Sequence, residues 1–338
     1  MNPTSQHELI QHLADKVKTC SRIAVTGNGT KPGMVESTTG ATVLQLNDLA
    51  GIIEYEPSEY TITVLAGTKL SDLIRQLDSC GQYLPFDPLL VDAGATVGGT
   101  IGANASGPGR FRYGGVRDFI IGVQFIDGRG RVVRGGGQVV KNAAGFDFPK
   151  LLVGSAGRLG VITEVTFKVF PNPEASLTAS TNTTSLLEAR KLVSQLRVKP
   201  YDLDAIEVDP DSRVIIRLAG HAEALSSRLS RIRQEVPGFD QWDSEQAVLF
   251  WQKLNHPAPD PSLHRIRMPV NAETLPLLPK IPIHFSSAMS VASFRIPSGS
   301  SLDLPHTNFD GVSVWPKSAF LDRLKAALDP ENKFGSLF

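Results

Sequence analysis

The stretch from Gly94 to Asp118 constrains the fold of this 338-residue chain more than any other. Eight of its residues are glycine, and each glycine inside a helix or central strand costs roughly 0.5–1 kcal/mol relative to alanine. We therefore expect neither a helix nor a central strand here. Backbone without side chains can approach a bound group closely and direct N–H donors at it, as a buried pyrophosphate requires. Side-chain donors at Thr96, Thr100, Asn104 and Ser106 favour this interpretation over a glycine-rich surface loop, as do Val97, Ile101 and Val116, which resemble buried anchors.

Two further glycine clusters flank this run. Thr26–Gly33 follows a predicted strand at 22–25, and a strand followed by a glycine loop is typical of phosphate sites. The loop lacks the Gly-Lys-Ser/Thr ending of a P-loop, and Pro32 and Gly33 argue against the helix that a Rossmann fingerprint needs. Taken alone, this loop fits an ordinary turn as well as it fits a phosphate site. The third cluster, Gly154–Gly160, opens an alternating strand at 161–169.

Hydrophobic periodicity and turn residues predict an α+β chain. The expected helices are 7–17, 69–79 (capped by Thr68 and stopped by Gly81), a short one around Leu151, 185–196, 221–236, 244–254 and 317–328. The expected strands are 22–25, 42–46, 51–54, 61–65, 120–126, 131–134, 161–169, 205–208, 214–218, 291–296 and 311–314. Phe250 and Trp251 are interpreted as core residues.

A change of composition near Pro173 predicts a domain boundary. We expect one domain over 1–173, with subdomains of about 1–50 and 51–173, an α+β cap over 174–316, and a C-terminal helix and tail over 317–338.

Composition excludes several classes of protein. The formal net charge is zero, which argues against nucleic acid and anionic membrane surfaces as partners. No apolar run approaches the roughly 20 residues of a membrane span, and Met1–Lys16 has no apolar signal core. Cys20 and Cys80 fit no metal spacing and are interpreted as reduced thiols. These features predict a cytoplasmic protein.

Several short motifs occur in the order seen in the vanillyl-alcohol-oxidase or PCMH-type FAD-binding proteins, which the chain resembles over about residues 20–172. They are Gly27-Asn28-Gly29-Thr30-Lys31, Leu84-Pro85-Phe86-Asp87-Pro88, Ala95–Gly99, Asn104–Gly107, Tyr113–Asp118 and Gly157–Glu164. Within that superfamily the chain is most similar to the FAD-binding E chains of bacterial glycolate oxidase. The segment 137–147 carries the most specific part of this likeness.

The resemblance implies a two-subdomain PCMH-type FAD-binding domain followed by a smaller α+β cap. It places the pyrophosphate at 27–31 and 95–99, the adenine towards Gly157–Ile162 and the flavin ring facing the cap, with Tyr113, Gly114 and Asp118 closing over the cofactor. The cofactor-binding residues it implies are Gly27, Asn28, Gly29, Thr30, Lys31, Pro85, Gly94, Ala95, Thr96, Val97, Gly98, Gly99, Gly102, Ala103, Asn104, Ser106, Gly107, Tyr113, Gly114, Asp118, Gly157, Gly160, Val161 and Ile162.

The chain departs from its relatives in three ways. Many of them bond flavin covalently through a loop histidine, but the histidines here, at 7, 12, 221, 256, 264, 284 and 306, lie outside the loops. We therefore expect non-covalent FAD. The cap lacks the metal-binding histidines and the His-Gly-Asp-Gly-Asn-type motif of the catalytic D chains, so we expect no metal and interpret its histidines as lone surface or core residues. The tail after Phe334 also differs, so a C-terminal flavin contact is not expected.

Three functions fit these observations. The first is the FAD-binding subunit of a glycolate (2-hydroxy acid) oxidase complex, acting on a CH–OH group with a catalytic flavin subunit and an iron–sulfur subunit, and peripheral to the inner membrane through those partners. The second is independent oxidation of a small 2-hydroxy acid, for which Lys141, Arg117 and Arg295 are candidate cations, although no histidine base can be assigned. The third is a flavin-binding structural subunit without activity of its own. Catalytic residues stay unknown.

Overall fold

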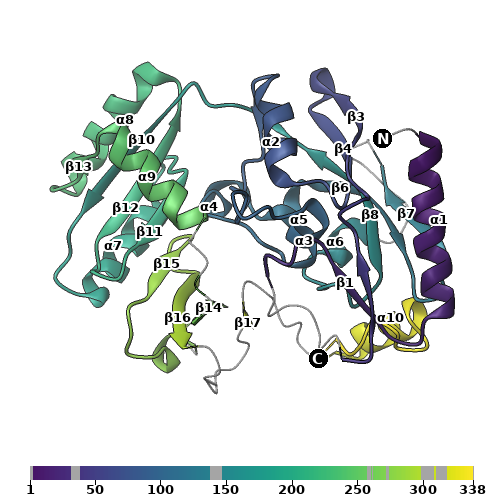
Figure 1. The fold of residues 1–338 in the computed structure, drawn as a ribbon. Helices are drawn as coiled ribbons and strands as arrows, with labels where there is room; N and C mark the ends of the chain where they lie inside the picture. Colours follow the sequence, from purple (N-terminus) through teal and green to yellow (C-terminus); the bar gives the residue numbers. More distant parts are fainter. Residues whose placement is uncertain are drawn as a thin grey trace.

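A computed structural model describes residues 3–31, 39–137, 147–256, 260, 262–271, 274–297, 308–309 and 318–337. Its elements form two lobes side by side (Figure 1). The first lobe comprises residues 3–171 and 318–337, and the second comprises 175–309. Residues 138–146 and 311–317, which hold Lys141 and the strand expected at 311–314, lie outside the described part.

The first lobe is built on an antiparallel five-stranded sheet of order β3-β4-β8-β6-β7 and a parallel pair, β1 and β2. Its strands are β1 (Ile23–Thr26), β2 (Thr42–Gln45), β3 (Ile52–Glu56), β4 (Thr61–Leu65), β5 (Gln82–Tyr83), β6 (Ile120–Ile126), β7 (Val132–Gly136), β8 (Val161–Lys168) and β9 (Phe170–Pro171). Its helices are α1 (Pro3–Thr19), α2 (Leu70–Asp78), α3 (Val97–Gly102), α4 (Arg110–Tyr113), α5 (Val116–Phe119), α6 (Phe148–Leu152) and α10 (Ala319–Leu328), with a 3-10 turn at Pro57–Glu59.

The central strand β8 is buried along nearly its whole length; β4 and β6 pair with its two edges, and α3 packs against it. The C-terminal segment returns to this lobe: the backbone N–H of Ile23 donates to the carbonyl oxygen of Lys333 at 2.7 Å, and Phe334 is buried in the same core. Residues at opposite ends of the chain therefore build one lobe.

Two predictions for the first lobe are wrong. The run 94–118 contains the short helices α3, α4 and α5, although its glycine content predicted no helix. The reason is close packing: a Cβ on Gly98 would lie 3.0 Å from Cβ of Ala66, so only glycine lets α3 lie this near the end of β4. Thr68 does not cap α2. Lys69 holds the N-cap position, and the Thr68 hydroxyl instead bonds the backbone of Gly51.

The second lobe is an eight-stranded sheet of order β13-β10-β12-β11-β15-β16-β14-β17. Its strands are β10 (Ala175–Thr181), β11 (Ala205–Val208), β12 (Val214–Gly220), β13 (Asp240–Gln241), β14 (Leu263–Pro269), β15 (His284–Ser286), β16 (Val291–Pro297) and β17 (Asn308–Phe309). Its helices are α7 (Leu186–Val198), α8 (Ala222–Glu235) and α9 (Ser244–Asn255), with a 3-10 turn at Leu275–Leu277. The predicted boundary at Pro173 falls between β9 and β10, and the domain limits stay a prediction.

The two faces of this sheet differ in chemistry. One face is apolar, with Leu177 and Ile206 in a core that also contains Leu192 of α7 and Leu229 of α8. Successive strand residues point to opposite faces, so Thr178, Ser180, Glu207 and Arg217 lie on the other face. The pattern-based prediction missed β10, β13, β14, β15 and β17. For β10 and β14 the reason is a weak apolar signal: β10 (Ala-Ser-Leu-Thr-Ala-Ser-Thr) has one large apolar residue, and β14 (Leu-His-Arg-Ile-Arg-Met-Pro) contains two arginines and a histidine.

Helix α9 carries aromatic residues to the polar face. The indole N–H of Trp251 donates to the Thr178 hydroxyl at 2.9 Å, and the Phe250 ring lies 4.9 Å from the Trp251 ring. Both side chains are only half-buried, and α9 has no fully buried residue, so their interpretation as core residues is wrong. The two rings cover part of the polar face of the sheet, and part of each side chain stays accessible to solvent.

Candidate cofactor cavity and lobe junction

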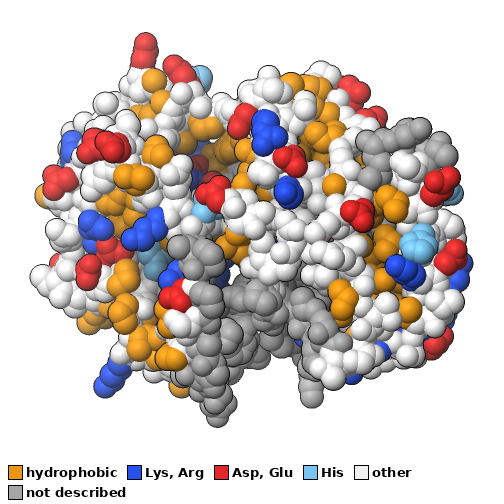
Figure 2. Space-filling model, in the orientation of Figure 1, with side chains coloured by type: hydrophobic (Ala, Val, Ile, Leu, Met, Phe, Trp, Pro, Cys, Tyr) orange, Lys and Arg blue, Asp and Glu red, His pale blue; other side chains and the backbone are white. Residues whose placement is uncertain are grey.

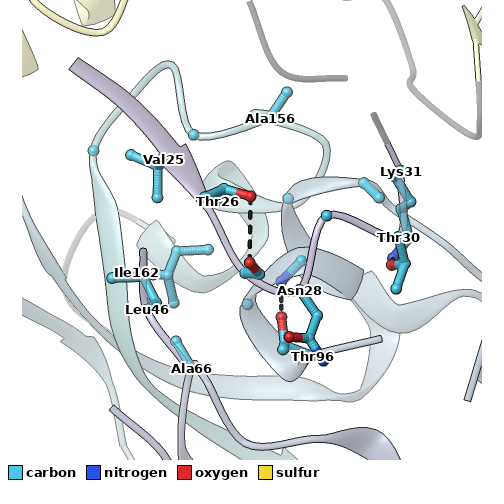
Figure 3. Close-up of a pocket in the computed structure, with 18 residues that line it drawn as sticks. Val25, Thr26, Asn28, Thr30, Lys31, Leu46, Ala66, Thr96, Ala156 and Ile162 are labelled. Carbon is cyan, nitrogen blue, oxygen red and sulfur yellow. Dashed lines mark hydrogen bonds between the residues drawn. The ribbon is translucent and has the colours of Figure 1, made fainter. Parts of the chain in front are cut away.

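An open cavity lies in the first lobe where β1, β2, β4, α3 and the start of β8 converge (Figure 3). Glycine occupies seven of its lining positions. The lining residues are Val25, Thr26, Gly27, Asn28, Gly29, Thr30, Lys31, Leu46, Ala66, Thr96, Gly98, Gly99, Gly102, Ala103, Ala156, Gly157, Gly160 and Ile162. All three glycine clusters of the sequence therefore meet at one place.

The loop after β1 forms one wall, and its shape depends on glycine. A Cβ on Gly27 would overlap Oγ1 of Thr96, so the loop lies directly against the start of α3. Gly29 has φ +65°, a left-handed conformation that disfavours other residues. Within the described part of the chain, the backbone N–H groups of Asn28, Gly29 and Thr30 donate no hydrogen bond. Three such donors beside a cavity can receive an anion.

The start of α3 forms the facing wall. The hydroxyl of Thr96 accepts from the backbone N–H of Gly99 at 3.3 Å, and the N–H of Gly98 donates to the carbonyl oxygen of Ala66 at 2.7 Å. The side-chain amide of Asn28 donates to the carbonyl oxygen of Gly94 at 2.9 Å. The Asn28 bond ties the first loop to the central glycine run, and the other two fix the start of α3.

The third wall is the turn before β8. Gly157 has φ +75° and Gly160 has φ +152°, and a Cβ on Gly160 would lie 2.6 Å from the carbonyl oxygen of Ile126. Figure 3 shows Val25, Leu46 and Ile162 on one side of the cavity and Thr30 with the buried Lys31 on the other. The cavity thus has an apolar end and a polar, cationic end.

The other residues that the sequence suggested lie outside the lining of this cavity: Pro85, Gly94, Ala95, Val97, Asn104, Ser106, Gly107, Tyr113, Gly114, Asp118 and Val161. Several of them stabilise the segments next to the cavity. Ser106 accepts a hydrogen bond from the N–H of Val116 at 2.9 Å, and the Asp118 carboxylate accepts one from the N–H of Gly115 at 2.8 Å. Tyr113 packs edge-on against Phe170. Their contact with a cofactor stays a prediction.

A buried ion cluster joins the two lobes. Arg217 on β12 bonds the carboxylate of Asp204 beside it and, at 2.6 Å, the carboxylate of Asp87 in the first lobe. The guanidinium also lies 4.8 Å from the centre of the Trp251 ring. Sequence analysis did not single out Arg217 or Asp204, because an arginine inside an apolar strand resembles a surface residue until its partners are placed.

Burial shifts the acid–base behaviour of this cluster. Burial raises the pKa of the Asp87 carboxyl, although Arg217 opposes the shift. Burial alone lowers the pKa of Arg217, but the two carboxylates outweigh it and raise that pKa above its ordinary value. Burial also raises the pKa of Tyr83 and of Tyr113, which lie near the cluster. Two acids therefore share one cation at the lobe junction.

Comparison with known proteins places these features in a family. A sequence model of the FAD binding domain matches residues 1–136. Glycolate oxidase subunit GlcE of Escherichia coli (strain K12) is 34% identical over 246 residues, which are 73% of this chain and 67% of that protein. The chain belongs to this FAD-binding family. FAD is the family's cofactor, and the predicted α+β fold and FAD-dependent oxidoreductase class are confirmed.

Other relatives match this chain over a smaller part of their own length. Glycolate oxidase subunit GlcD of Bacillus subtilis (strain 168) is 36% identical over 157 residues, which are 46% of this chain and 33% of that protein. The D-lactate dehydrogenase of Anaerostipes hadrus is 32% identical over 170 residues, which are 49% of this chain and 35% of that protein. This chain thus spans about a third of these two relatives.

A solved structure supports the fold of both lobes together. Alkyldihydroxyacetonephosphate synthase aligns with 97% of this chain and 74% of its own, with a TM-score of 0.69 at 15% identity. Among the described residues, no helix is long and apolar enough to cross a membrane, and no group of three or more metal-ligating side chains is found. Two histidines of the second lobe have hydrogen-bond partners: His256 accepts from the N–H of Val91, and His284 bonds Glu207.

Proposed function

We propose that this chain is the FAD-binding subunit of a glycolate or related 2-hydroxy acid oxidase, and that it holds FAD non-covalently across the cavity of the first lobe. The observation that carries the proposal is the convergence of three glycine clusters on one cavity, with the N–H groups of Asn28, Gly29 and Thr30 directed to no partner in the described chain. The names of the relatives GlcE and GlcD support the substrate class.

The lining matches the chemistry of FAD. A pyrophosphate needs several donors and a cation, which the loop after β1 supplies through its N–H groups and Lys31. The apolar wall of Val25, Leu46 and Ile162 suits a flat aromatic ring such as adenine. Among the residues that the structure describes, no histidine or cysteine lines the cavity, which supports non-covalent binding. The other predicted contacts, from Pro85 to Asp118, would then face the remaining length of the cofactor.

Bound FAD supplies hydride and electron acceptance, and the protein supplies position and electrostatics. In this chain the glycines permit backbone to approach the phosphates, and Thr96 fixes the start of α3 beside them. We propose that electrons pass onward through a catalytic flavin subunit and an iron–sulfur subunit, in an assembly located in the cytoplasm or at the inner membrane.

The visible absorption spectrum of the purified protein tests this proposal. We expect a flavin spectrum that moves entirely to the supernatant after acid precipitation. A colourless protein that cannot be reconstituted with FAD would contradict the proposal, and flavin retained in the precipitate would contradict non-covalent binding. Anaerobic glycolate then separates the alternatives: a stable oxidised spectrum favours the subunit, and bleaching favours independent oxidation.

Independent oxidation is the second candidate. The cations suggested for it fit poorly, because the side chains of Arg117 and Arg295 are exposed and Lys141 lies outside the described residues. The second lobe, however, presents another arginine and a bonded histidine at the junction. This arrangement is the observation that favours the second candidate.

A further inference from the structure

A cleft lies beside α7, on the helix-covered face of the second-lobe sheet. One wall is α7 itself, and the other is formed by the residues that follow β14 and by the turn between β15 and β16. The ion cluster of Arg217 is on the opposite face of the sheet, next to the hollow that Figure 2 shows where the lobes meet. We call this second site the α7 cleft, because it is separate from both the hollow and the cofactor cavity.

The rim of the α7 cleft carries two cations without a counterion. Arg190 and Arg197 are exposed, and neither guanidinium forms a hydrogen bond or an ion pair within the described part of the chain. They are seven positions apart, so they lie on one face of α7, about 10 Å apart along its axis. The acidic residue of this helix, Glu188, bonds Thr184 instead. Two positive charges therefore remain available at one opening.

The floor of the α7 cleft is apolar and buried. Val193 lies between the two arginines on α7 and is 2% exposed, and Ala288 and Met289 of the facing turn are 3% and 8% exposed. All three belong to the core of the second lobe. A cationic rim above an apolar floor suits a ligand with an anionic group on a short carbon body, because each part of the ligand meets a matching surface.

The turn that holds Ala288 and Met289 has an unusual backbone. Ser287, Ala288 and Met289 have left-handed φ angles of 51°, 54° and 64°, which non-glycine residues seldom adopt. The N–H of Ser287 donates to the Glu207 carboxylate at 3.1 Å, and the N–H of Ala288 donates to the carbonyl oxygen of Ile206 at 2.9 Å. The next N–H, that of Met289, donates to no residue that the structure describes. Strained backbone of this kind is typical of ligand sites, and here a lining residue keeps an unused donor.

We propose that the α7 cleft binds a small phosphate monoester. A phosphate group carries a charge of about −1.5 to −2 at pH 7 and three acceptor oxygens, so it can bind two guanidinium groups at once. A carboxylate has one charge and two oxygens, and it would satisfy only one arginine. Arg190 and Arg197 bind the phosphate, and the carbon body lies on Val193 and Met289. The inference goes beyond the proposed function and does not depend on it, because the α7 cleft shares no lining residue with the cofactor cavity.

Calorimetric titration of the purified FAD-loaded protein with propyl phosphate, inorganic phosphate and butyrate tests the ligand class. We expect propyl phosphate to bind about tenfold more tightly than inorganic phosphate, because the floor buries roughly two of its methylene groups. Butyrate should bind about tenfold more weakly than propyl phosphate, because it engages one arginine. Equal binding of all three would contradict both the apolar floor and the paired arginines.

Substitutions on α7 test the site itself. Arg190→Gln and Arg197→Gln should each weaken propyl phosphate about tenfold, and both side chains are exposed, so the lobe should stay folded. Lys191→Gln is the matched control, since it removes the same charge from the same helix at an exposed position outside the cleft. Its effect should be less than about twofold. Equal losses in all three variants, or unchanged binding in both arginine variants, would overturn the site.

Methionine methyl NMR gives a second readout. Propyl phosphate should shift the Met289 resonance, identified by its loss in Met289→Leu, more than that of Met268, which lies on β14 but does not line the cleft. No methionine is found among the described residues that line the cofactor cavity. If the protein holds FAD and Met289 does not respond, the α7 cleft proposal is wrong and the FAD proposal stands. A Met289 response in protein that cannot hold FAD would support the cleft and contradict only the FAD proposal.

Discussion

The cavity of the first lobe is built mainly from backbone, whereas the polar face of the second lobe is built from side chains. In the cavity, glycine brings backbone N–H groups close together, and the short side chains of Thr96 and Asn28 bond to backbone atoms. At the junction, Arg217, Arg267, Glu207 and His284 depend on polar or aromatic partners. Substitutions that add atoms where the backbone walls touch should damage the cavity most, and substitutions that remove a charged or polar partner should damage the junction most.

The largest expected effect is at the ion cluster. Arg217→Met leaves Asp87 and Asp204 buried without their cation, and breaking a buried pair in this way costs about 3–5 kcal/mol. The free energy of unfolding, measured by urea denaturation, should fall by that amount. Arg213→Met is the matched control, because Arg213 also pairs an aspartate but is more exposed, so its loss should cost less. Equal effects of the two substitutions would contradict the distinction.

Added volume at Gly27 should damage the cavity more than it damages the fold. Gly27→Val forces atoms into Thr96, and overpacking of this kind costs about 1–3 kcal/mol. We expect FAD affinity, measured by fluorescence titration of the apoprotein, to fall by about tenfold or more. The double variant Gly27→Ala with Thr96→Ala should bind better than Gly27→Ala alone, since it removes the overlapping oxygen. No recovery would show that the two walls do not meet as described.

Stability should depend on pH through Asp87. Its pKa is raised in the folded state, so the folded protein binds a proton more readily than the unfolded chain does. The resulting stabilisation is complete below the ordinary pKa of 3.8 and is lost as pH rises through the raised value. In the Asp87→Asn variant, the free energy of unfolding should not decline with pH in this way. Urea denaturation of both proteins between about pH 4 and pH 7 would show it as a difference in slope, and parallel curves would argue against a protonated Asp87.

The smallest effect should come from Gly29→Ala. A Cβ there meets nothing within 4 Å, so only the left-handed φ opposes the substitution, at roughly 1–2 kcal/mol. FAD affinity should fall less than in Gly27→Val, although both positions belong to the same loop. The same fluorescence titration compares them, and a larger loss at Gly29 would mean that a bound group occupies the open space beside it.

Much of the first lobe was predictable because its signals are local. The strands predicted at 61–65 and 120–126 match β4 and β6, because a short apolar run bounded by turn residues usually forms a buried strand. The glycine clusters predicted a phosphate site, and Gly27–Lys31, Thr96, Gly98, Gly99, Gly102, Gly157, Gly160 and Ile162 do line one cavity. The helix α3 was missed, because its glycines are favoured by packing against Ala66 rather than by helix propensity.

The second lobe was harder to predict. Ala175–Thr181 consists mostly of alanine, serine and threonine, and Leu263–Pro269 contains two arginines and a histidine, so neither segment has the large apolar residues that predict a buried strand. Glu207 and His284 are 77 positions apart and give no motif. Their meeting depends on the pairing of β11 with β15.

The amino-acid sequence by itself determined the family, the cofactor class and the backbone loops. Glycine patterns extend over only a few residues, so they can be recognised before the contacts of those residues are known. Only the tertiary structure decided which charges are paired, that Arg217 bonds Asp87 across the lobes, and that Arg190 and Arg197 line one cleft with Met289. The physical reason is that a side chain's charge and burial depend on residues distant in sequence, whereas a glycine's conformational freedom belongs to the residue itself.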